Sequence, residues 1–337
     1  MPDPCLAGRR SQKSAAFLEG ISERHSKKGR KMKSQDICEK ITTAVIAELE
    51  KGVLPWNKPW AGNGVQVMPR RHNGLRYRGI NIIILWGKAE EAGYRSPFWM
   101  TFKQALEYGA NVRKGEKGTQ IVYMNRVTKS EPNEAGEDIE RSFGFLKSYT
   151  VFNVDQIENL PAQFLAPCPA LVPDDKDWSA YAVVGGWFDA IPAEVRHGGD
   201  RACFIPSLDR IEMPDREGFF TPQHYFSVRA HETIHWTKME SRLNRDFGRV
   251  RWGDEGYAME ELVAELGAAF TMAELGMVPA IREDHAPYIS HWLRVLKNDS
   301  KAILTAAAKA SDALEYLSKF RGISEAEAEE SACAEAA

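Results

Sequence analysis

The chain has 337 residues, of which 43% are hydrophobic and 27% are charged, as in ordinary soluble globular proteins. Residues 1–35 contain no apolar signal-peptide core, and no apolar run reaches the length of a membrane span, so we expect a cytoplasmic protein with no membrane partner. The five cysteines are scattered and never spaced as C-x-x-C, which indicates a reducing compartment and argues against a cysteine-bound metal.

The net charge of −3 hides an asymmetry between the two halves of the chain. Residues 1–160 contain 26 Lys and Arg against 18 Asp and Glu, whereas residues 161–337 contain 18 against 29. The excess is concentrated in residues 51–129, with 14 basic and 4 acidic side chains. A basic half and an acidic half predict different partners, and a polyanion is expected for the first.

The chain begins with a basic stretch, residues 1–34, which we interpret as a disordered arm because it has few large apolar residues. Apolar residues then recur at helical spacing from Ile37 to Leu49, and Gly52 is expected to end that helix. The two prolines in Leu54–Trp60 exclude regular structure there.

Two further signals predict the rest of the first domain. Thr101 and Gln104 form a capping box that begins a short helix ending at Gly109. Residues Thr119–Val127 and Phe143–Val154 alternate like strands on either side of an acidic loop, and we expect them to pair as a long hairpin.

The second half has a different organisation. Four prolines in residues 161–173 indicate a domain boundary. A helix is expected at Trp178–Ala190, short strands at Ala202–Ile205 and Arg210–Met213, and three or four helices from Ser227 to Phe320. The predicted fold class is therefore α+β with two domains: a mixed α/β domain followed by a mainly helical one.

The most specific chemical motif is H-E-x-x-H at His231, Glu232 and His235. Histidines four residues apart share one face of a helix, so both rings can reach one cation, and Glu232 lies close enough to act as general base toward a water. Neutral imidazole suits one Zn²⁺ per chain, although other divalent metals accept it as well. The alternative is a helix that carries these three residues by chance.

A catalytic zinc ion needs a third protein ligand. Lys238 and Ser241 occupy the positions where a metzincin would have glycine and histidine, so that class is excluded. On the next amphipathic helix, Glu261 and Glu265 are four residues apart and resemble the E-x-x-x-D/E helix of gluzincins. That resemblance implies Glu261 as metal ligand and Glu265 as the partner of a ligating histidine. The neighbouring Glu260 is the alternative to Glu261 at this position, and we interpret it as a solvated residue.

Aromatic residues alternate with the basic residues of the first half, as single-stranded nucleic-acid binders require, because cations neutralise phosphates and rings stack on unpaired bases. Trp56 and Trp60, which flank Lys58 in a proline-rich loop, are expected to be exposed. The alternatives are that the rings form the core, or that the partner is a duplex.

Five motifs in residues 37–161 resemble the N-terminal single-stranded-DNA-binding domain of the ArdC antirestriction family. They are Trp56–Trp60, Tyr77–Asn81, Pro97–Ala105, Val112–Gly118 and Val151–Ile157. The second half resembles the same family, through Phe204–Pro206, Asp209–Pro214, His231–Trp236 and Glu260–Gly267. The resemblance implies a mobile-element protein that protects incoming DNA during conjugation, with an SprT-type zinc metallopeptidase as its second domain.

On this basis we expect an arm at 1–34, a single-stranded-DNA-binding domain at 35–161, a linker at 162–175, a zincin-like domain at 176–322 and an acidic tail at 323–337. A protein substrate, DNA-bound or restriction-related, is a second candidate partner, and we expect the strand at Arg210–Met213 to bind it as an extended peptide by strand addition. The rival hypothesis is a non-catalytic DNA-binding protein whose metal domain is structural or mediates protein interactions. Candidate DNA-binding residues are Trp56, Lys58, Trp60, Tyr77, Arg78, Asn81, Trp99, Lys103, Arg113, Lys114 and Lys117.

Overall fold

The computed structural model describes residues 34–57, 67–132, 138–164, 177–248, 254–277 and 285–321. Almost all of the predicted basic arm, most of the predicted linker and the predicted acidic tail lie outside these residues. The chain forms two compact units, and it passes between them more than once. The first unit is Met1–Lys51 with Pro69–Cys168, and the second is Gly52–Met68 with Pro169–Ala337.

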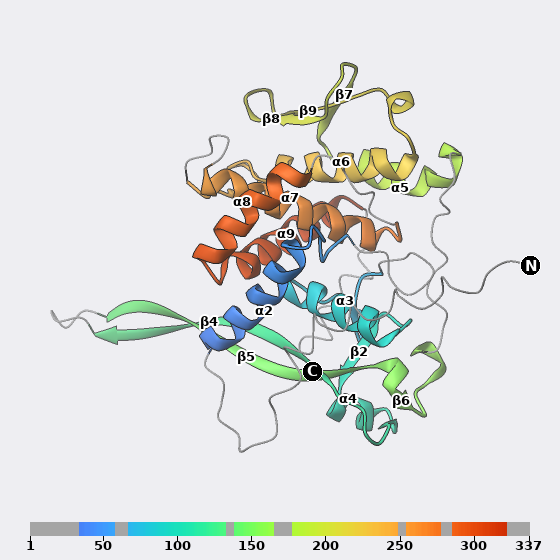
Figure 1. Ribbon diagram of the computed structural model, residues 1–337, viewed down its shortest axis with the longest axis vertical. Helices are drawn as coiled ribbons and strands as arrows, with labels where there is room; N and C mark the ends of the chain where they lie inside the picture. The colour runs from blue at the N-terminus through green and yellow to red at the C-terminus, as the bar shows by residue number, and fades with distance from the viewer. Residues whose placement is uncertain are drawn as a thin grey trace, which may run out of the picture. The chain divides into compact units, whose positions relative to one another are not determined.

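The first unit combines helices with a mixed sheet, as the sequence predicted (Figure 1). The sheet has the strand order β1-β2-β5-β4, in which only β1 and β2 run parallel. The helices and strands are α2 (Ser34–Leu49), β1 (Arg70–Arg71), α3 (Ile80–Ala92), β2 (Phe98–Thr101), α4 (Phe102–Glu107), β4 (Thr119–Pro132) and β5 (Asp138–Asn153). A second, two-stranded sheet pairs β3 (Asn111–Val112) with β6 (Ile157–Glu158).

Two local predictions are confirmed in this unit. The Gln104 backbone N–H donates to the Thr101 hydroxyl (3.2 Å), and the Thr101 N–H donates to the Gln104 side chain (2.8 Å), which is the capping box at the start of α4. The hairpin β4–β5 is also present and is longer than predicted, with Thr119 opposite Val151 at its base.

The second unit is mainly helical (Figure 1). Helix α7 packs against α6, α8 and α9, and a three-stranded sheet of order β7-β9-β8 lies beside α6. The helices are α5 (Ala182–Asp189), α6 (Pro222–Trp236), α7 (Glu255–Glu274), α8 (His285–Asn298) and α9 (Ala302–Ser318), and the strands are β7 (Glu194–His197), β8 (Cys203–Ile205) and β9 (Arg210–Met213).

Helices α6 and α7 approach each other closely because Gly267 faces Ile234. A Cβ atom added at Gly267 would lie 2.8 Å from both Cγ1 and Cδ1 of Ile234, which is closer than real side chains approach. Ile234 is fully buried, and its neighbour in sequence is His235. The missing side chain at Gly267 therefore sets the spacing between the two helices that carry the H-E-x-x-H motif and its acidic counterpart.

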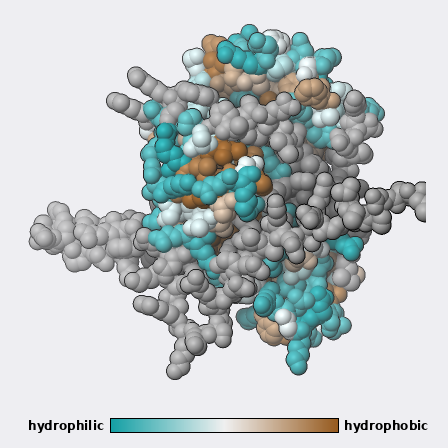
Figure 2. All heavy atoms as spheres, viewed as in Figure 1, coloured by the Kyte–Doolittle hydropathy of each residue, from teal (hydrophilic) through white to brown (hydrophobic). Residues whose placement is uncertain are grey.

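The described surface is largely hydrophilic on the face shown in Figure 2, and hydrophobic side chains gather there over helices of the second unit. Among the described residues, no helix is both long enough and apolar enough to cross a membrane.

Candidate metal centre

Helix α6 places the two histidines of the motif side by side, as predicted. It begins at Pro222, and the Thr221 hydroxyl caps it by accepting from the His224 N–H (3.1 Å). One turn separates His231 from His235, and their ring centroids are 4.7 Å apart. Both side chains are buried, so their nitrogen atoms need partners inside the protein.

Helix α7 contributes Glu261, and the three predicted ligands come together. The Nε2 atoms of His231 and His235 are 3.1 Å apart, and each lies 3.5 Å from a carboxylate oxygen of Glu261. Ligands roughly 2.0–2.1 Å from a tetrahedral zinc ion are separated by roughly 3.3–3.4 Å. Two imidazoles and one carboxylate with these spacings therefore suit a divalent metal such as zinc.

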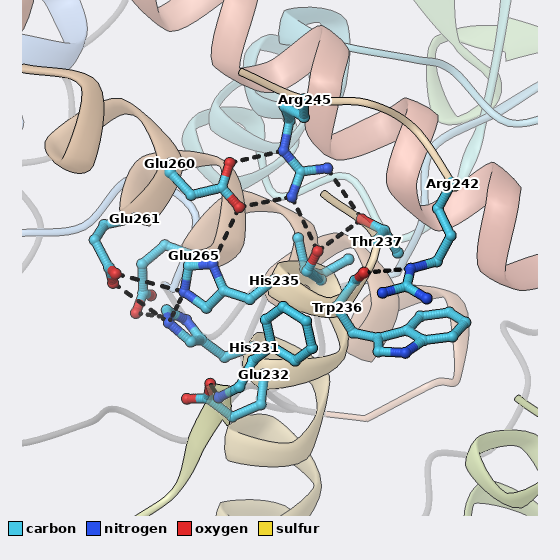
Figure 3. Close-up of polar contacts among 12 residues, drawn as sticks. His231, Glu232, His235, Trp236, Thr237, Arg242, Arg245, Glu260, Glu261 and Glu265 are labelled. Carbon is cyan, nitrogen blue, oxygen red and sulfur yellow. Dashed lines mark hydrogen bonds and ion pairs between the residues drawn. The ribbon is translucent and has the colours of Figure 1, made fainter. Parts of the chain in front are cut away.

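Each histidine also has a carboxylate at its other ring nitrogen. His231 Nδ1 lies 3.4 Å from Glu265, the residue that the gluzincin resemblance implies as a histidine partner, and His235 Nδ1 lies 3.1 Å from Glu260 (Figure 3). The interpretation of Glu260 as a solvated residue is wrong, because its side chain is buried and contacts the candidate ligand His235. Such partners fix the orientation of a ligating imidazole. They also determine which of its two ring nitrogens carries the proton.

The buried charges of this centre compensate one another. Burial by itself raises the pKa of Glu261, but the charge of His235 and the hydrogen bond from His231 outweigh it and hold that pKa well below its usual range. Burial by itself lowers the pKa of His235, but Glu261 and Glu260 outweigh it and raise that pKa. Without metal, the ligand set therefore favours a proton on the histidine side, and a bound cation would replace that proton.

Glu232 is buried beside the ligand set without belonging to it. Its Oε2 atom accepts a hydrogen bond from the Phe204 backbone N–H of β8 at 2.8 Å. Strand β8 is an edge of the sheet, whereas β9 is its central strand. The expectation that Arg210–Met213 pairs with an extended peptide is therefore wrong, because β7 and β8 occupy both of its sides.

Two tyrosines near the site differ in their surroundings. The Tyr225 hydroxyl is buried and hydrogen-bonds to His197 Nε2 at 2.8 Å, which is a packing role. Tyr257 lies one helical turn before Glu261 on α7, and its hydroxyl is 3.5 Å from that of Tyr288. Burial, together with Tyr288 and Glu261, raises the pKa of Tyr257, so its hydroxyl keeps its proton and can donate a hydrogen bond.

Two arginines after α6 are part of the site, although no motif in the sequence indicated them. Arg245 donates to Glu260, and Arg242 donates to the Trp236 carbonyl at 2.6 Å (Figure 3). Arg242 also pairs with Asp209. Long-range pairing of this kind leaves no spacing pattern in a single sequence.

Among the predicted DNA-binding residues, Trp56 is not exposed. Its ring is fully buried and packs edge-on against Trp292 at 5.8 Å in the second unit. A buried ring cannot stack on a base, so the expectation for Trp56 is wrong. Its proposed neighbours, Lys58 and Trp60, lie outside the described residues.

Three more of these candidates stabilise the fold of the first unit. The buried Tyr77 hydroxyl donates to the carbonyl of the buried Trp99 at 3.2 Å. The Asn81 side chain both donates to the Val122 carbonyl (2.7 Å) and accepts from its N–H (2.9 Å), which ties α3 to β4. These groups are committed to contacts within the protein.

The remaining candidates are exposed cations on the first unit. Arg113 pairs with Glu116, and the Lys103 side chain is 88% exposed and lies on α4 beside Phe102, whose ring is half exposed. The exposed cations are Arg78, Lys103, Arg113, Lys114 and Lys117.

Both units match families of known proteins. Residues 35–152 match the model for the N-terminal domain of anti-restriction factor ArdC, and residues 183–309 match a zincin-like metallopeptidase model. Protein y4eC of Sinorhizobium fredii is 32% identical over 288 residues, which cover 84% of this chain and 91% of y4eC. DNA primase TraC of Escherichia coli is 35% identical over 303 residues, but the chain spans only 27% of TraC.

Solved structures show the same similarity over both units. The metal-free crystal structure of antirestriction protein ArdC from plasmid R388 has a TM-score of 0.70 and 39% identity, covering 85% of this chain and 97% of that one. Its Mn(II)-bound structure has a TM-score of 0.67 and 37% identity, covering 85% and 98%. The protein from R388 thus has Mn(II) bound in one of its crystal structures.

Proposed function

Because this chain belongs to the ArdC family of antirestriction proteins, we propose that it is a mobile-element protein that protects incoming DNA from restriction during conjugation. Its first unit binds single-stranded DNA, and its second unit is a zinc-dependent peptidase. A DNA-bound or restriction-related protein is the class of substrate that would connect the two activities.

The observation that carries the peptidase proposal is the position of Glu232. A structural zinc site needs only its ligands, and it is closed by four of them. Here the site has only three candidate ligands. Beside them lies the buried carboxylate of Glu232, which is not one of the ligands and accepts a hydrogen bond from the edge strand β8. That combination supports catalysis over a purely structural metal.

In the proposed reaction, His231, His235 and Glu261 would hold zinc, which when bound would supply the Lewis acidity that makes water a better nucleophile near neutral pH. Glu232 takes a proton from the attacking water and passes it to the leaving amine. To do so, its carboxylate leaves the Phe204 N–H. That N–H points away from β9, so it is then available to an extended peptide added at the edge of β8.

We propose that the Tyr257 side chain assists this reaction. Its protonated hydroxyl lies close to Glu261 and can donate to the carbonyl oxygen on which negative charge develops. Tyr225 takes no such part, because its hydroxyl is bound to His197.

The proposed DNA contacts use what the first unit exposes. Lys103, Lys114 and Lys117 neutralise phosphates, and the half-exposed ring of Phe102 offers a stacking surface beside Lys103. The buried Trp56 and Trp99 are excluded from direct contact.

Full-length protein loaded with zinc should be incubated with a pool of peptides, with and without single-stranded DNA, and cleavage followed by mass spectrometry. We expect hydrolysis by the wild type and by Glu240→Gln, which makes the same chemical change at an exposed position. Glu232→Gln should keep its metal and lose hydrolysis.

Undiminished hydrolysis by metal-replete Glu232→Gln would refute the catalytic role. If the metal-loaded wild type cleaves neither the peptides nor itself, the non-catalytic alternative holds, with a metal domain that is structural or binds proteins.

A further inference from the structure

Arg245 is a buried arginine whose donors are used within the second unit. Its side chain is 1% exposed. It donates two parallel hydrogen bonds to the Glu260 carboxylate, at 2.8 Å and 2.7 Å. It also donates to the Thr237 hydroxyl (3.0 Å) and to the Ile234 carbonyl (2.9 Å) at the end of α6 (Figure 3). A buried guanidinium is stable only with such a set of acceptors.

The loop after α6 turns back, so that Arg245 lies against the end of α6. The Lys238 N–H donates to the His235 carbonyl (3.0 Å), and the Arg245 N–H donates to the Lys238 carbonyl (2.9 Å). Asn244 adopts a left-handed conformation (φ 43°), which asparagine tolerates better than most residues. The turn therefore brings Arg245 back against the end of the H-E-x-x-H helix.

Glu260 joins Arg245 to a metal ligand. Its Oε1 atom accepts from Arg245 and lies 3.1 Å from His235 Nδ1. An ionised carboxylate only accepts hydrogen bonds, so the proton of this contact is on Nδ1. The other nitrogen, Nε2, is then left to bind a metal, and it is the atom that faces His231 and Glu261.

We propose that Arg245 is a positioning residue of the metal centre: it holds the Glu260 carboxylate so that His235 presents Nε2 to the cation. This inference rests on the metal site of the proposed function and not on the peptidase activity. It assigns metal-binding importance to two residues that donate no ligand atom.

The simpler alternative is that Arg245 only caps the end of α6, and the chain contains a matched control for that role. Arg242 caps the same helix end through the Trp236 carbonyl at 2.6 Å and packs over the Trp236 ring at 4.0 Å. It pairs with Asp209 instead of Glu260. Removing Arg242 therefore removes a buried capping arginine without touching the partner of His235.

The test measures metal affinity and the cobalt(II) absorption spectrum of full-length protein for Arg245→Met, Arg242→Met, Glu260→Gln and the double variant Arg245→Met with Glu260→Gln. Outer partners of metal-bound histidines typically contribute 10–100-fold in affinity. We expect a loss of that size, and a changed spectrum, for Arg245→Met and for Glu260→Gln. Arg242→Met should lower the melting temperature but keep the affinity and the spectrum of the wild type.

Because Arg245 acts through Glu260, adding Arg245→Met to Glu260→Gln should lower the affinity little further. The double variant also leaves no unpaired charge, so it tests the proposal if Arg245→Met alone does not fold.

Equal effects of Arg245→Met and Arg242→Met on affinity, or fully additive effects in the double variant, would overturn the proposal and leave Arg245 as a helix cap. Failure of the metal site itself is a separate result, since wild-type protein would then bind no cobalt in the same experiment.

Discussion

At the scale of single residues, the candidate centre has an inner set of three ligand groups and an outer set of carboxylates that contact the histidines. Three ligand groups face one another, and each histidine is backed by its own carboxylate, Glu265 for His231 and Glu260 for His235. A ligand contributes an electron pair to the metal, whereas an outer carboxylate only orients a ring. The two kinds of glutamate on α7 should therefore differ in how much metal affinity they contribute.

We expect Glu265→Gln to weaken zinc binding by roughly 10–100-fold, and Glu261→Gln to weaken it more, because the second change weakens a ligand itself. Competition against a fluorescent chelator measures both affinities. Glu274→Gln, at the far end of the same helix, serves as the control and should match the wild type. A larger loss for Glu265→Gln than for Glu261→Gln would reverse the two assignments.

The motif residues could be predicted because they are neighbours on one helix, where spacing in sequence fixes spacing in space. Glu261 and Glu265 lie on a different helix, and their roles were implied by the resemblance of that helix to the second metal-site helix of gluzincins. Arg245 and Glu260 were not predictable, because their contact joins a loop to a different helix, and a lone arginine or glutamate usually marks a solvated surface. Sequence patterns do not reveal buried charged residues that form ion pairs with each other across different elements.

At the scale of elements, the site depends on how closely α6 and α7 pack, and Gly267 controls that distance. We expect Gly267→Ala to lower the free energy of unfolding. Overpacking typically costs about 1–3 kcal/mol, which the better helix propensity of alanine offsets by about 1 kcal/mol. Metal affinity should fall as well, because Ile234 lies next to His235. Thermal unfolding and chelator competition measure the two effects.

Gly186 provides the control for Gly267. It lies in α5, and a Cβ atom added there meets nothing within 4 Å. Gly186→Ala should therefore raise the melting temperature without changing metal affinity. A stabilising effect of Gly267→Ala would show that Ile234 moves aside without cost, and that the glycine does not set the helix spacing.

Elements with strong local signals were predictable from the sequence. The capping box of α4 and the alternation in β4 and β5 led directly to the observed structures. Strand β7 was missed because Glu194–His197 has polar residues where an alternating core face would be, and because it pairs in parallel with β9 and not with β8, the next strand along the chain. Missing β7 also made β9 look like a free edge.

At the scale of the whole molecule, the two units are interleaved along the chain, because residues 52–68 belong to the second unit. From the sequence we assigned this segment to the DNA-binding domain. Trp56 packs against Trp292, and no pattern in the residues around Trp56 indicates a contact with a residue so far along the chain. Binding studies should therefore use the full-length chain, because a fragment that ends near residue 161 would leave Trp56 without its partner.

For the full-length protein we expect tighter binding to single-stranded than to double-stranded DNA, with affinity that falls steeply as salt increases. Charge reversal at Lys114 and Lys117 should reduce the salt slope by roughly 0.7 per lost phosphate contact. Phe102→Ala should lower affinity with little change in slope, because a stacking ring touches no phosphate. Fluorescence anisotropy over a salt series measures both quantities.

Lys309→Glu is the matched control, because Lys309 is an exposed lysine of the second unit. It should leave both affinity and slope unchanged. Equal affinity for single-stranded and double-stranded DNA at moderate salt, or equal effects of Lys309→Glu and of the Lys114 and Lys117 changes, would show that binding follows overall charge and not a surface of the first unit.

The central claim, that the second unit holds one zinc ion in a catalytic arrangement, is tested most directly by anomalous X-ray diffraction from crystals of the zinc-loaded protein. We expect one zinc peak bound by His231 Nε2, His235 Nε2 and Glu261, with Glu232 nearby but not coordinating and the fourth position open to solvent. A peak closed by a fourth protein ligand, or the absence of any peak between these three side chains, would contradict it.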